Sequence, residues 1–178
     1  EGSIYKQKMD NAIEKERQGY VKINNSLFRM YGTNMYPDAT FTLRLSFGTI
    51  SGYEEKSKLV PPFTTIGGAY KHSTEFDNKG DYKLPNRWFF RKGLVNLKTR
   101  LDFISNLDIT GGNSGSPVFN RNREIVGIVF DSNIEGLVSD YDFNYTRSAR
   151  AVAVHSAGIL EVLKKIYRAG PLVSELTR

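Results

Sequence analysis

Residues 110–117 have the sequence TGGNSGSP, and an alternating stretch, PVFNRNREIVGIVFD, covers 117–131. Apolar residues on both sides of the RNR turn predict a β-hairpin, whose second strand is apolar on both faces, as in a closed barrel. The small residues around Ser114 let the backbone fold tightly, so the N–H groups of Gly112 and Ser114 can converge as an oxyanion hole. By itself, the motif is equally compatible with a glycine-rich turn before a strand.

The segments after the hairpin favour the interpretation of residues 110–117 as a loop that carries a nucleophile over the interpretation as a simple turn. RAVAVHS at 150–156 predicts another strand, and SAGILEVLKKIYRAGP at 156–171 predicts a closing helix over 157–168, with Ser156 as its cap and Gly170-Pro171 as its stop. An α/β-hydrolase would have a glycine two residues after the serine and then a helix, but this chain has Ser116 and a hairpin. Chymotrypsin-like serine proteases show the order found here.

The region before the motif predicts one helix, a strand with one buried face, surface loops and a second short strand, LDFIS, at 101–105. Residues 3–17 are charged, with apolar residues at helical spacing, which predicts a helix with a narrow buried stripe. At 41–47, Phe and Leu alternate with Thr, Arg and Ser, which predicts a strand with its apolar face buried. Residues 60–70 and 71–86 predict loops. RWFFRKG at 87–93 is interpreted as aromatic filler beneath the long loop, with a nucleic-acid platform as the alternative.

Composition narrows the class of protein. The chain has 178 residues, of which 39% are hydrophobic and 25% charged, as expected for one folded domain. The absence of cysteine excludes disulfides and thiol catalysis, and two histidines make a metal site improbable, so no metal and no cofactor are expected. The net charge of +6 favours anionic partners, but the basic residues are scattered, so no nucleic-acid partner is predicted. No apolar run is long enough to cross a membrane, so no membrane partner is predicted.

Three stretches together resemble a known family. DITGGNSGSPVFN (108–120), EIVGIVFDSNIE (124–135) and VAVHSAGILEVL (152–163) are similar to the C-terminal barrel of the S46 dipeptidyl peptidases, bacterial serine exopeptidases that release N-terminal dipeptides. The resemblance implies a mostly β fold: the second antiparallel β-barrel of a chymotrypsin-like double-barrel protease, with an N-terminal helical segment and a C-terminal helix. It also implies that 1–35 ends a helical insertion and that 36–178 form the barrel with its closing helix.

The resemblance also implies roles for four residues. Ser114 corresponds to the nucleophile, Gly112 to an oxyanion N–H donor, and Asp131 to the carboxylate that holds the substrate's α-ammonium group. Ser132 occupies the pocket position that separates a branch preferring apolar residues from the branch preferring Asp or Glu, and serine goes with the latter. A neutral hydroxyl binds a carboxylate less strongly than a cation does, so a nearby cation or water is expected to assist it. The alternatives are a turn aspartate and an inconsequential surface serine.

The chain departs from the family in its catalytic base. In the family, the catalytic His and Asp precede the serine in the sequence. The one histidine before Ser114 is His72, and its surroundings, KHST, do not resemble the family's histidine motif. His155 follows Ser114 and is interpreted as structural. The chain is therefore expected to be a fragment that is inactive alone; a noncatalytic peptide-binding module is the alternative. The resemblance implies that the partners are peptide substrates with a free N-terminus, and that the full-length protein can form a homodimer. It also implies a location in the periplasm or on the surface of a Gram-negative bacterium.

Overall fold

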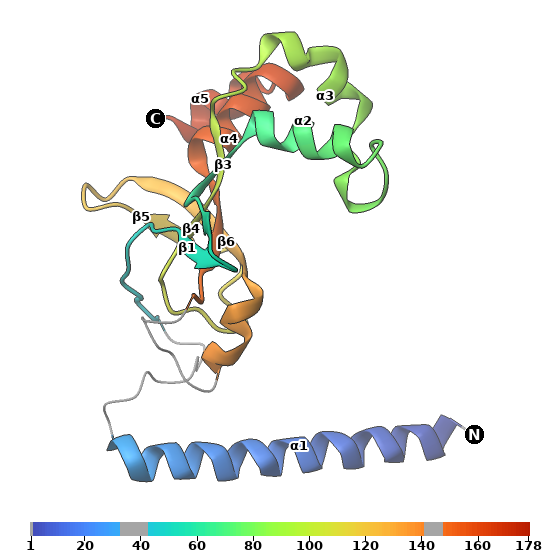
Figure 1. Ribbon diagram of the computed structural model, residues 1–178, viewed down its shortest axis with the longest axis vertical. Helices are drawn as coiled ribbons and strands as arrows, with labels where there is room; N and C mark the ends of the chain where they lie inside the picture. The colour runs from blue at the N-terminus through green and yellow to red at the C-terminus, as the bar shows by residue number, and fades with distance from the viewer. Residues whose placement is uncertain (1, 33–42, 141–147) are drawn as a thin grey trace.

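The structure is a computed structural model that describes residues 2–32, 43–140 and 148–178 (Figure 1). Its first half contains α1 (Gly2–Tyr31), β1 (Tyr53–Glu55), β2 (Lys58–Val60), β3 (Phe63–Thr65), α2 (Ile66–Glu75), η2 (Gly80–Tyr82), α3 (Asn86–Arg91) and η3 (Lys92–Leu94). Its second half contains β4 (Arg100–Ser105), β5 (Pro117–Phe119), β6 (Ile125–Ser132), η4 (Ile134–Asp140), β7 (Ala151–His155), α4 (Ser156–Glu161), η5 (Val162–Tyr167) and α5 (Gly170–Leu176). The chain is thus a mixture of helices and antiparallel strands, and the prediction of a mostly β fold is wrong.

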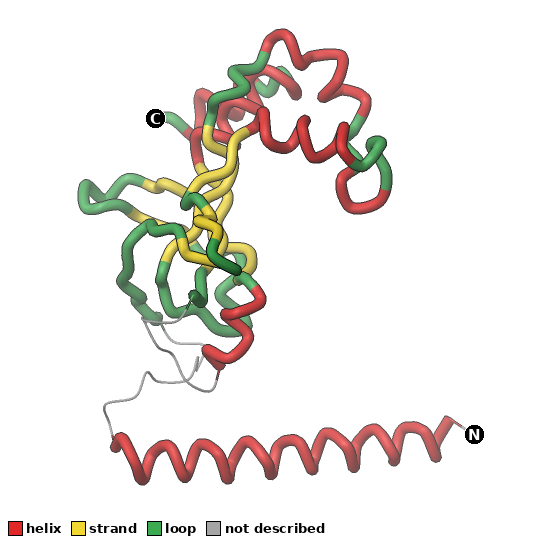
Figure 2. The backbone as a smooth tube through the Cα atoms, in the orientation of Figure 1, coloured by secondary structure: helices red, strands yellow, loops and turns green. Residues whose placement is uncertain are grey.

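Five strands form one antiparallel sheet in the order β3-β4-β7-β6-β5, and β1 pairs with β2 separately. The register sets Ser105 of β4 and Ser132 of β6 opposite Ala151 of β7, so these three residues mark one end of the sheet. Helices α2, α3, α4 and α5 gather at the other end, as Figures 1 and 2 show. We call the end marked by Ala151 the loop end.

The hairpin predicted for 117–131 is confirmed. Strands β5 and β6 pair with Val118 opposite Gly127. The side chain of Asn120 organises the turn, because its Oδ1 accepts from the N–H of Asn122 at 2.9 Å and of Glu124 at 3.0 Å. The backbone of Arg123 closes the turn in the left-handed region, with a φ of 67°.

The closing helix is also confirmed, as α4 followed by the π-helical η5. Its cap differs from the prediction: His155, one residue before Ser156, accepts from the Ala157 N–H through Nδ1 at 3.1 Å. The helix stops at Arg168, which is left-handed, and Pro171 then lies in the first turn of α5. The Gly170-Pro171 pair therefore separates two helices.

The core consists of two clusters of buried side chains. One lies in the sheet and is built on Phe103, Val129 and Ala153. The other joins α2 to η5 at the helical end of the sheet and comprises Ile66, Tyr70, Val95 and Ile166. The closing helix is thus attached to the sheet through α2, an element that the sequence analysis did not predict.

Loops were predicted where the structure has α2, and no helix was predicted at the position of α3. Thr65 caps α2 by accepting from the Gly68 N–H at 3.2 Å, and Ile66 and Tyr70 are buried one turn apart. Two glycines in its first turn weaken the helical signal in the sequence, and tertiary burial outweighs that low propensity. In α3, Trp88 packs against the core as expected, whereas Phe90 is 86% exposed, so the filler interpretation is wrong for that side chain.

The segment predicted as a strand at 41–47 is not a strand where the structure describes it: residues 43–49 have no regular secondary structure, and the exposure of their side chains is the opposite of the one expected. Leu43, Leu45 and Phe47 are exposed, while Arg44 and Ser46 face inward; residues 41 and 42 lie outside the described residues. The polar face turns inward because both of its side chains find a partner in Asp108. A one-residue register change exchanges the two faces of an extended segment, so these polar contacts decide the outcome.

The predicted closed barrel is not found among the described residues. Residues 43–50 run beside the loop that follows β4, with a bridge between Ile50 and Ser105, and form no ladder with β5 in the part of the chain that the structure describes. A cavity of about 670 Å³ remains between this segment and β5, lined by apolar side chains that include Phe103 and Val118. The sheet stays open because the segment that would close it is held by its side chains to the loop after β4.

The N-terminal helix is longer than the 3–17 predicted, and α1 extends over 30 residues as a straight rod (Figure 1). Its predicted stripe of Ile4, Met9 and Ile13 is exposed rather than buried. The predicted domain boundary between residues 35 and 36 lies outside the described residues.

Gly127 is expected to be essential for the sheet core. A Cβ added there would lie 2.5 Å from Cε1 of Phe103 and 2.5 Å from the carbonyl oxygen of Val154. Gly127→Ala should therefore lower the free energy of unfolding by about 1–3 kcal/mol, measured by urea denaturation. Gly93→Ala is the control, since an added Cβ there meets nothing within 4 Å; equal losses in both variants would contradict the packing argument.

Candidate active site

The loop between β4 and β5 carries the TGGNSGSP motif and lies at the loop end of the sheet. It folds on itself through the Asn113 N–H, which donates to the Thr110 oxygen at 3.2 Å, and the Ser116 N–H, which donates to the Asn113 oxygen at 3.0 Å. The Gly115 N–H fastens the loop to β6 by donating to the Val129 oxygen at 2.7 Å. Gly112 and Gly115 have φ values of 97° and 89°, a backbone conformation that side chains disfavour, which explains glycine at both positions.

The amides of Gly112 and Ser114, like that of Gly111, make no hydrogen bond within the described residues. The N–H groups of Asn113, Gly115 and Ser116 all donate within the loop or to β6. Across the described residues, those of Gly112 and Ser114 donate to no backbone or side-chain acceptor. Nothing lies within 4 Å of the position that a Cβ on Gly112 would occupy. The two donors on either side of Asn113 are therefore available for a ligand oxygen.

The Ser114 hydroxyl is exposed and directed at β6. Its Oγ donates to the carbonyl oxygen of Phe130 at 3.3 Å. Asp131 and Ser132 follow Phe130 on the same strand, so the structure brings the predicted nucleophile, ammonium anchor and pocket residue to one short stretch of β6. All four site residues predicted from the sequence thus gather at the loop end.

Asp131 and Ser132 differ in exposure. The Asp131 carboxylate is exposed, and its Oδ1 accepts from the Ser132 N–H at 2.8 Å. Ser132 is half-buried beside η4: a Cβ on Gly136 would lie 3.0 Å from the Ser132 Cβ and 3.1 Å from its Oγ. The glycine at 136 therefore leaves the space that the Ser132 side chain occupies.

Neither histidine contacts Ser114 within the described residues. His72 lies on α2, where its ring stacks on Tyr82. His155 pairs with Gly127 at the opposite end of β6 from Ser132, and its ring packs against Phe103 with centroids 5.7 Å apart. Burial, and then the charge of Arg100, lower the pKa of His155. These contacts agree with the structural role predicted for His155.

The sequence analysis missed Arg44 and Asp108. The Arg44 guanidinium forms an ion pair with Asp108 through Nη2 and donates to Asn113 Oδ1 through Nη1 at 3.4 Å. Asn113 Oδ1 also accepts from the Thr110 N–H at 2.8 Å. Two signals in the sequence could have identified them. Arg44 is the one charged residue in the alternating stretch at 41–47, and Asp108 is the first residue of DITGGNSGSP.

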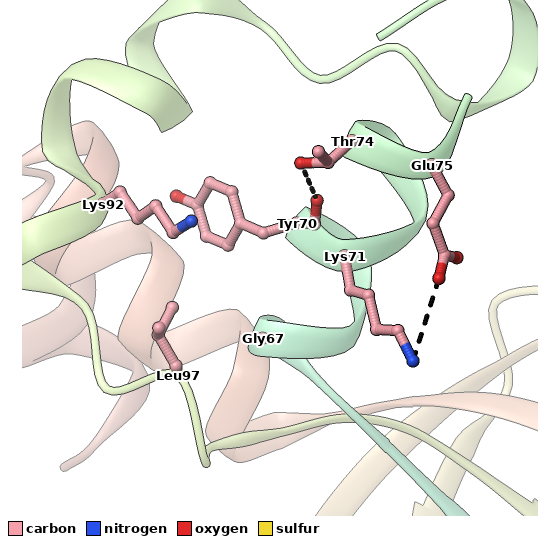
Figure 3. A pocket seen from close by; sticks show the side chains of 7 residues that line it. All are labelled: Gly67, Tyr70, Lys71, Thr74, Glu75, Lys92 and Leu97. Carbon is pink, nitrogen blue, oxygen red and sulfur yellow. Dashed lines mark hydrogen bonds and ion pairs between the residues drawn. The ribbon is translucent and has the colours of Figure 1, made fainter. Parts of the chain in front are cut away.

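A second pocket lies on α2, away from these residues. It has a volume of about 310 Å³ and is lined by Gly67, Tyr70, Lys71, Thr74, Glu75, Lys92 and Leu97 (Figure 3). Its polar groups have partners in the structure: Lys71 pairs with Glu75 at 3.8 Å, and Lys92 lies over the Tyr70 ring. It contains none of the predicted site residues.

Searches for metal and membrane features covered only the described residues. Among these, no three His, Cys, Asp or Glu side chains lie together as a metal-binding group. No helix in the described ranges is both long and apolar enough to span a membrane.

Several known peptidases are similar to this chain. An Asp/Glu-specific dipeptidyl-peptidase of Shewanella putrefaciens is 32% identical over 94% of this chain and 27% of its own length. Dipeptidyl-peptidase 7 of Porphyromonas endodontalis is 37% identical over 80% of this chain and 18% of its own length. The crystal structure of Porphyromonas endodontalis DPP11 matches with a TM-score of 0.74 and 26% identity, over 86% of this chain and 23% of that one.

The chain spans about a quarter of the length of these relatives. The sequence profile of the peptidase S46 family matches residues 2–178, which is almost the whole chain. The chain therefore belongs to the peptidase S46 family.

Proposed function

We propose that this chain is the nucleophile-bearing part of a serine dipeptidyl peptidase that releases N-terminal dipeptides with Asp or Glu as their second residue. The observation that carries the proposal is the exposed Ser114 hydroxyl beside two amides, of Gly112 and Ser114, that donate to no described acceptor. Membership of family S46 supports the reaction class. The chemistry uses side chains and backbone amides alone.

In this proposal, Ser114 attacks the carbonyl carbon of the second peptide bond, and the two amides bind the oxygen that becomes negative. A histidine elsewhere in the full-length protein takes the serine proton, because neither histidine contacts Ser114 within the described residues and a base must lie within about 2.6–3.2 Å of the proton it takes. On its own, the 178-residue chain is then inactive. We place the enzyme in the periplasm or on the surface of a bacterium, following the resemblance.

Asp131 fixes the length of the released fragment. Its exposed carboxylate lies one residue beyond Phe130, whose carbonyl accepts from Ser114. A substrate ammonium bound there leaves room for two residues before the scissile carbonyl, so the carboxylate acts as a ruler. Peptides with a blocked N-terminus would forfeit this charge-assisted bond.

Ser132 reads the residue before the cut. Relatives named for Asp/Glu specificity and relatives named dipeptidyl-peptidase 7 are both similar to this chain, so the choice rests on Ser132 itself. The ladder brings Arg150 beside Asn133, the residue after Ser132. The Arg150 guanidinium donates to the carbonyl oxygens of Ser51 and Gly52 at 3.1 and 2.9 Å.

The pocket assignment predicts a change of specificity in the full-length protein. Ser132→Gly should lower the ratio of kcat/KM for Asp over Leu substrates by about 10-fold, because a buried carboxylate loses a hydrogen-bond donor and an apolar side chain gains space. Ser132→Arg should keep the acidic preference, since a guanidinium offers charge and a two-pronged bond. The measurement is kcat/KM for paired Xaa-Asp and Xaa-Leu substrates in all three proteins.

Two results would contradict different parts of the proposal. An Asp-to-Leu ratio that does not change in Ser132→Gly would remove this residue from the pocket while leaving the peptidase intact. A wild-type protein that releases no dipeptides from either substrate would refute the reaction itself, and peptide binding without cleavage would then favour a noncatalytic module.

A further inference from the structure

The nucleophile loop is fastened from outside by the segment 43–49. Arg44 contacts two of its side chains, Asp108 and Asn113, and Ser46 Oγ donates to the Asp108 carbonyl oxygen at 2.7 Å. Further along, the Thr49 N–H donates to Asn106 Oδ1 at 2.6 Å. The segment therefore runs beside the loop as a brace and contacts it near both its beginning and its turn.

The ion pair between Arg44 of the brace and Asp108 of the loop is largely shielded from water. Their side chains are 13% and 4% exposed, so their attraction is screened by water far less than that of a surface pair. The guanidinium has a planar fork, and its two ends reach different residues: Nη2 binds Asp108 and Nη1 binds Asn113. A lysine, with one compact ammonium, could not reproduce both contacts in this geometry.

Asn113 is the residue between the two amides of the oxyanion hole. Its Oδ1 accepts from Arg44 and from the Thr110 N–H, so the peptide groups before and after it are held in one orientation. The glycines at 112 and 115, both with positive φ, do not restrict the loop by themselves, because glycine is free to adopt many backbone conformations. The Arg44 contact to Asn113 adds an external restraint to the bonds that the loop makes to itself and to β6.

We propose that Arg44 is a positioning residue: through Asn113 and Asp108 it orients the Gly112 and Ser114 amides toward the developing oxyanion. This role rests on the proposed peptidase function. The proposal distinguishes the amides of the loop, which Arg44 orients, from the substrate-binding residues Asp131 and Ser132, which lie on β6 and are not hydrogen-bonded to the brace within the described residues. Loss of Arg44 should therefore slow the chemical step and leave substrate binding nearly unchanged.

The test uses the full-length protein and steady-state kinetics on an Xaa-Asp substrate. Arg44→Ala should lower kcat by about 10- to 50-fold, less than the complete loss of one oxyanion donor, with KM changed by less than about 2-fold. Arg44→Lys should restore part of kcat. Arg91→Ala is the matched control, because Arg91 is another half-buried arginine, which donates to the Lys165 oxygen at 3.3 Å, far from the loop; its kcat should equal that of the wild type.

A double variant distinguishes loss of the positioning role from loss of folding. Arg44→Ala leaves the Asp108 carboxylate without its cation, so Arg44→Gln combined with Asp108→Asn removes both charges while keeping similar shapes. This double variant should show the same selective loss of kcat at an unchanged melting temperature. Unchanged kcat in it, or a rise of KM alone, would overturn the positioning role.

A double-mutant cycle tests whether Arg44 acts through Asn113. If it does, adding Asn113→Ala to Arg44→Ala should cost little beyond either single change, whereas independent residues would give multiplied losses of kcat and refute the route. Ser114→Ala distinguishes the two levels of the argument. Activity that survives Ser114→Ala would refute the proposed function, while activity that is lost with Ser114 but kept without Arg44 would refute the brace alone.

Discussion

Replacing Ser114 with alanine in the full-length protein is expected to lower kcat for dipeptide release by about 10⁶-fold, because in the proposed mechanism its hydroxyl forms the covalent bond to the substrate. The change removes a single exposed hydroxyl whose one hydrogen bond within the described residues is to the Phe130 oxygen at 3.3 Å, so the fold should be unaffected. The measurement is single-turnover and steady-state release of dipeptides, with melting temperature as a check on folding.

Ser116→Ala is the matched control for this change. Ser116 lies two residues further along the same loop, and its backbone bonds to Asn113 and Val129 are independent of its side chain. Its kcat should remain within about 3-fold of the wild type, since the change removes one half-buried hydroxyl that makes no hydrogen bond within the described residues. Loss of activity in Ser116→Ala together with retention in Ser114→Ala would reverse the assignment of the nucleophile.

Replacing Asp131 with alanine should weaken recognition of the substrate's free amino end. A charge-assisted hydrogen bond contributes about 1.5–3 kcal/mol, so kcat/KM for a free-amino peptide should fall by about 10- to 150-fold, mainly through KM. An N-acetylated version of the same peptide should already be poor with the wild type and should lose nothing further in the variant. The measurement is kcat/KM for both peptides with both proteins.

Asp131→Asn separates charge from local structure. The Asp131 Oδ1 accepts from the Ser132 N–H at 2.8 Å, and an asparagine oxygen can keep that bond while lacking the negative charge. The asparagine variant should therefore lose nearly as much activity as the alanine variant. Equal activity of the wild type on acetylated and free peptides would show that Asp131 does not anchor the ammonium group.

Local patterns in the sequence were sufficient for the elements nearest the site. The hairpin of β5 and β6 and the helix of α4 and η5 have strong periodicity and clear turn residues, and both are found. The helix α2 has two glycines in its first turn and a polar surface, so its signal is weak, and the burial of Ile66 and Tyr70 decides its structure. The longer helix α1 shows the same limit, because its apolar stripe is exposed in the described chain.

At residues 43–47 the apolar side chains are exposed and the polar ones face inward, and the cause of this difference from the prediction is more specific. Alternation identifies two faces but does not say which one faces inward when both have potential partners. Here Arg44 finds Asp108, 64 positions away in the sequence, and a buried ion pair of this kind is invisible to local patterns. The same long-range pair was therefore missed in the site, whereas Ser114, Gly112, Asp131 and Ser132 belong to contiguous motifs that a resemblance can identify.

The most direct test of the account is covalent labelling of the full-length protein with a fluorophosphonate, which forms a bond to an activated serine oxygen and releases fluoride. We expect one adduct, located by mass spectrometry on Ser114, together with loss of dipeptide release in proportion to labelling. Protection by a free-amino Xaa-Asp peptide, and no protection by its acetylated form, should accompany it. An adduct on another serine with the same loss of activity, or equal labelling of Ser114→Ala, would contradict the assignment of Ser114 as the nucleophile.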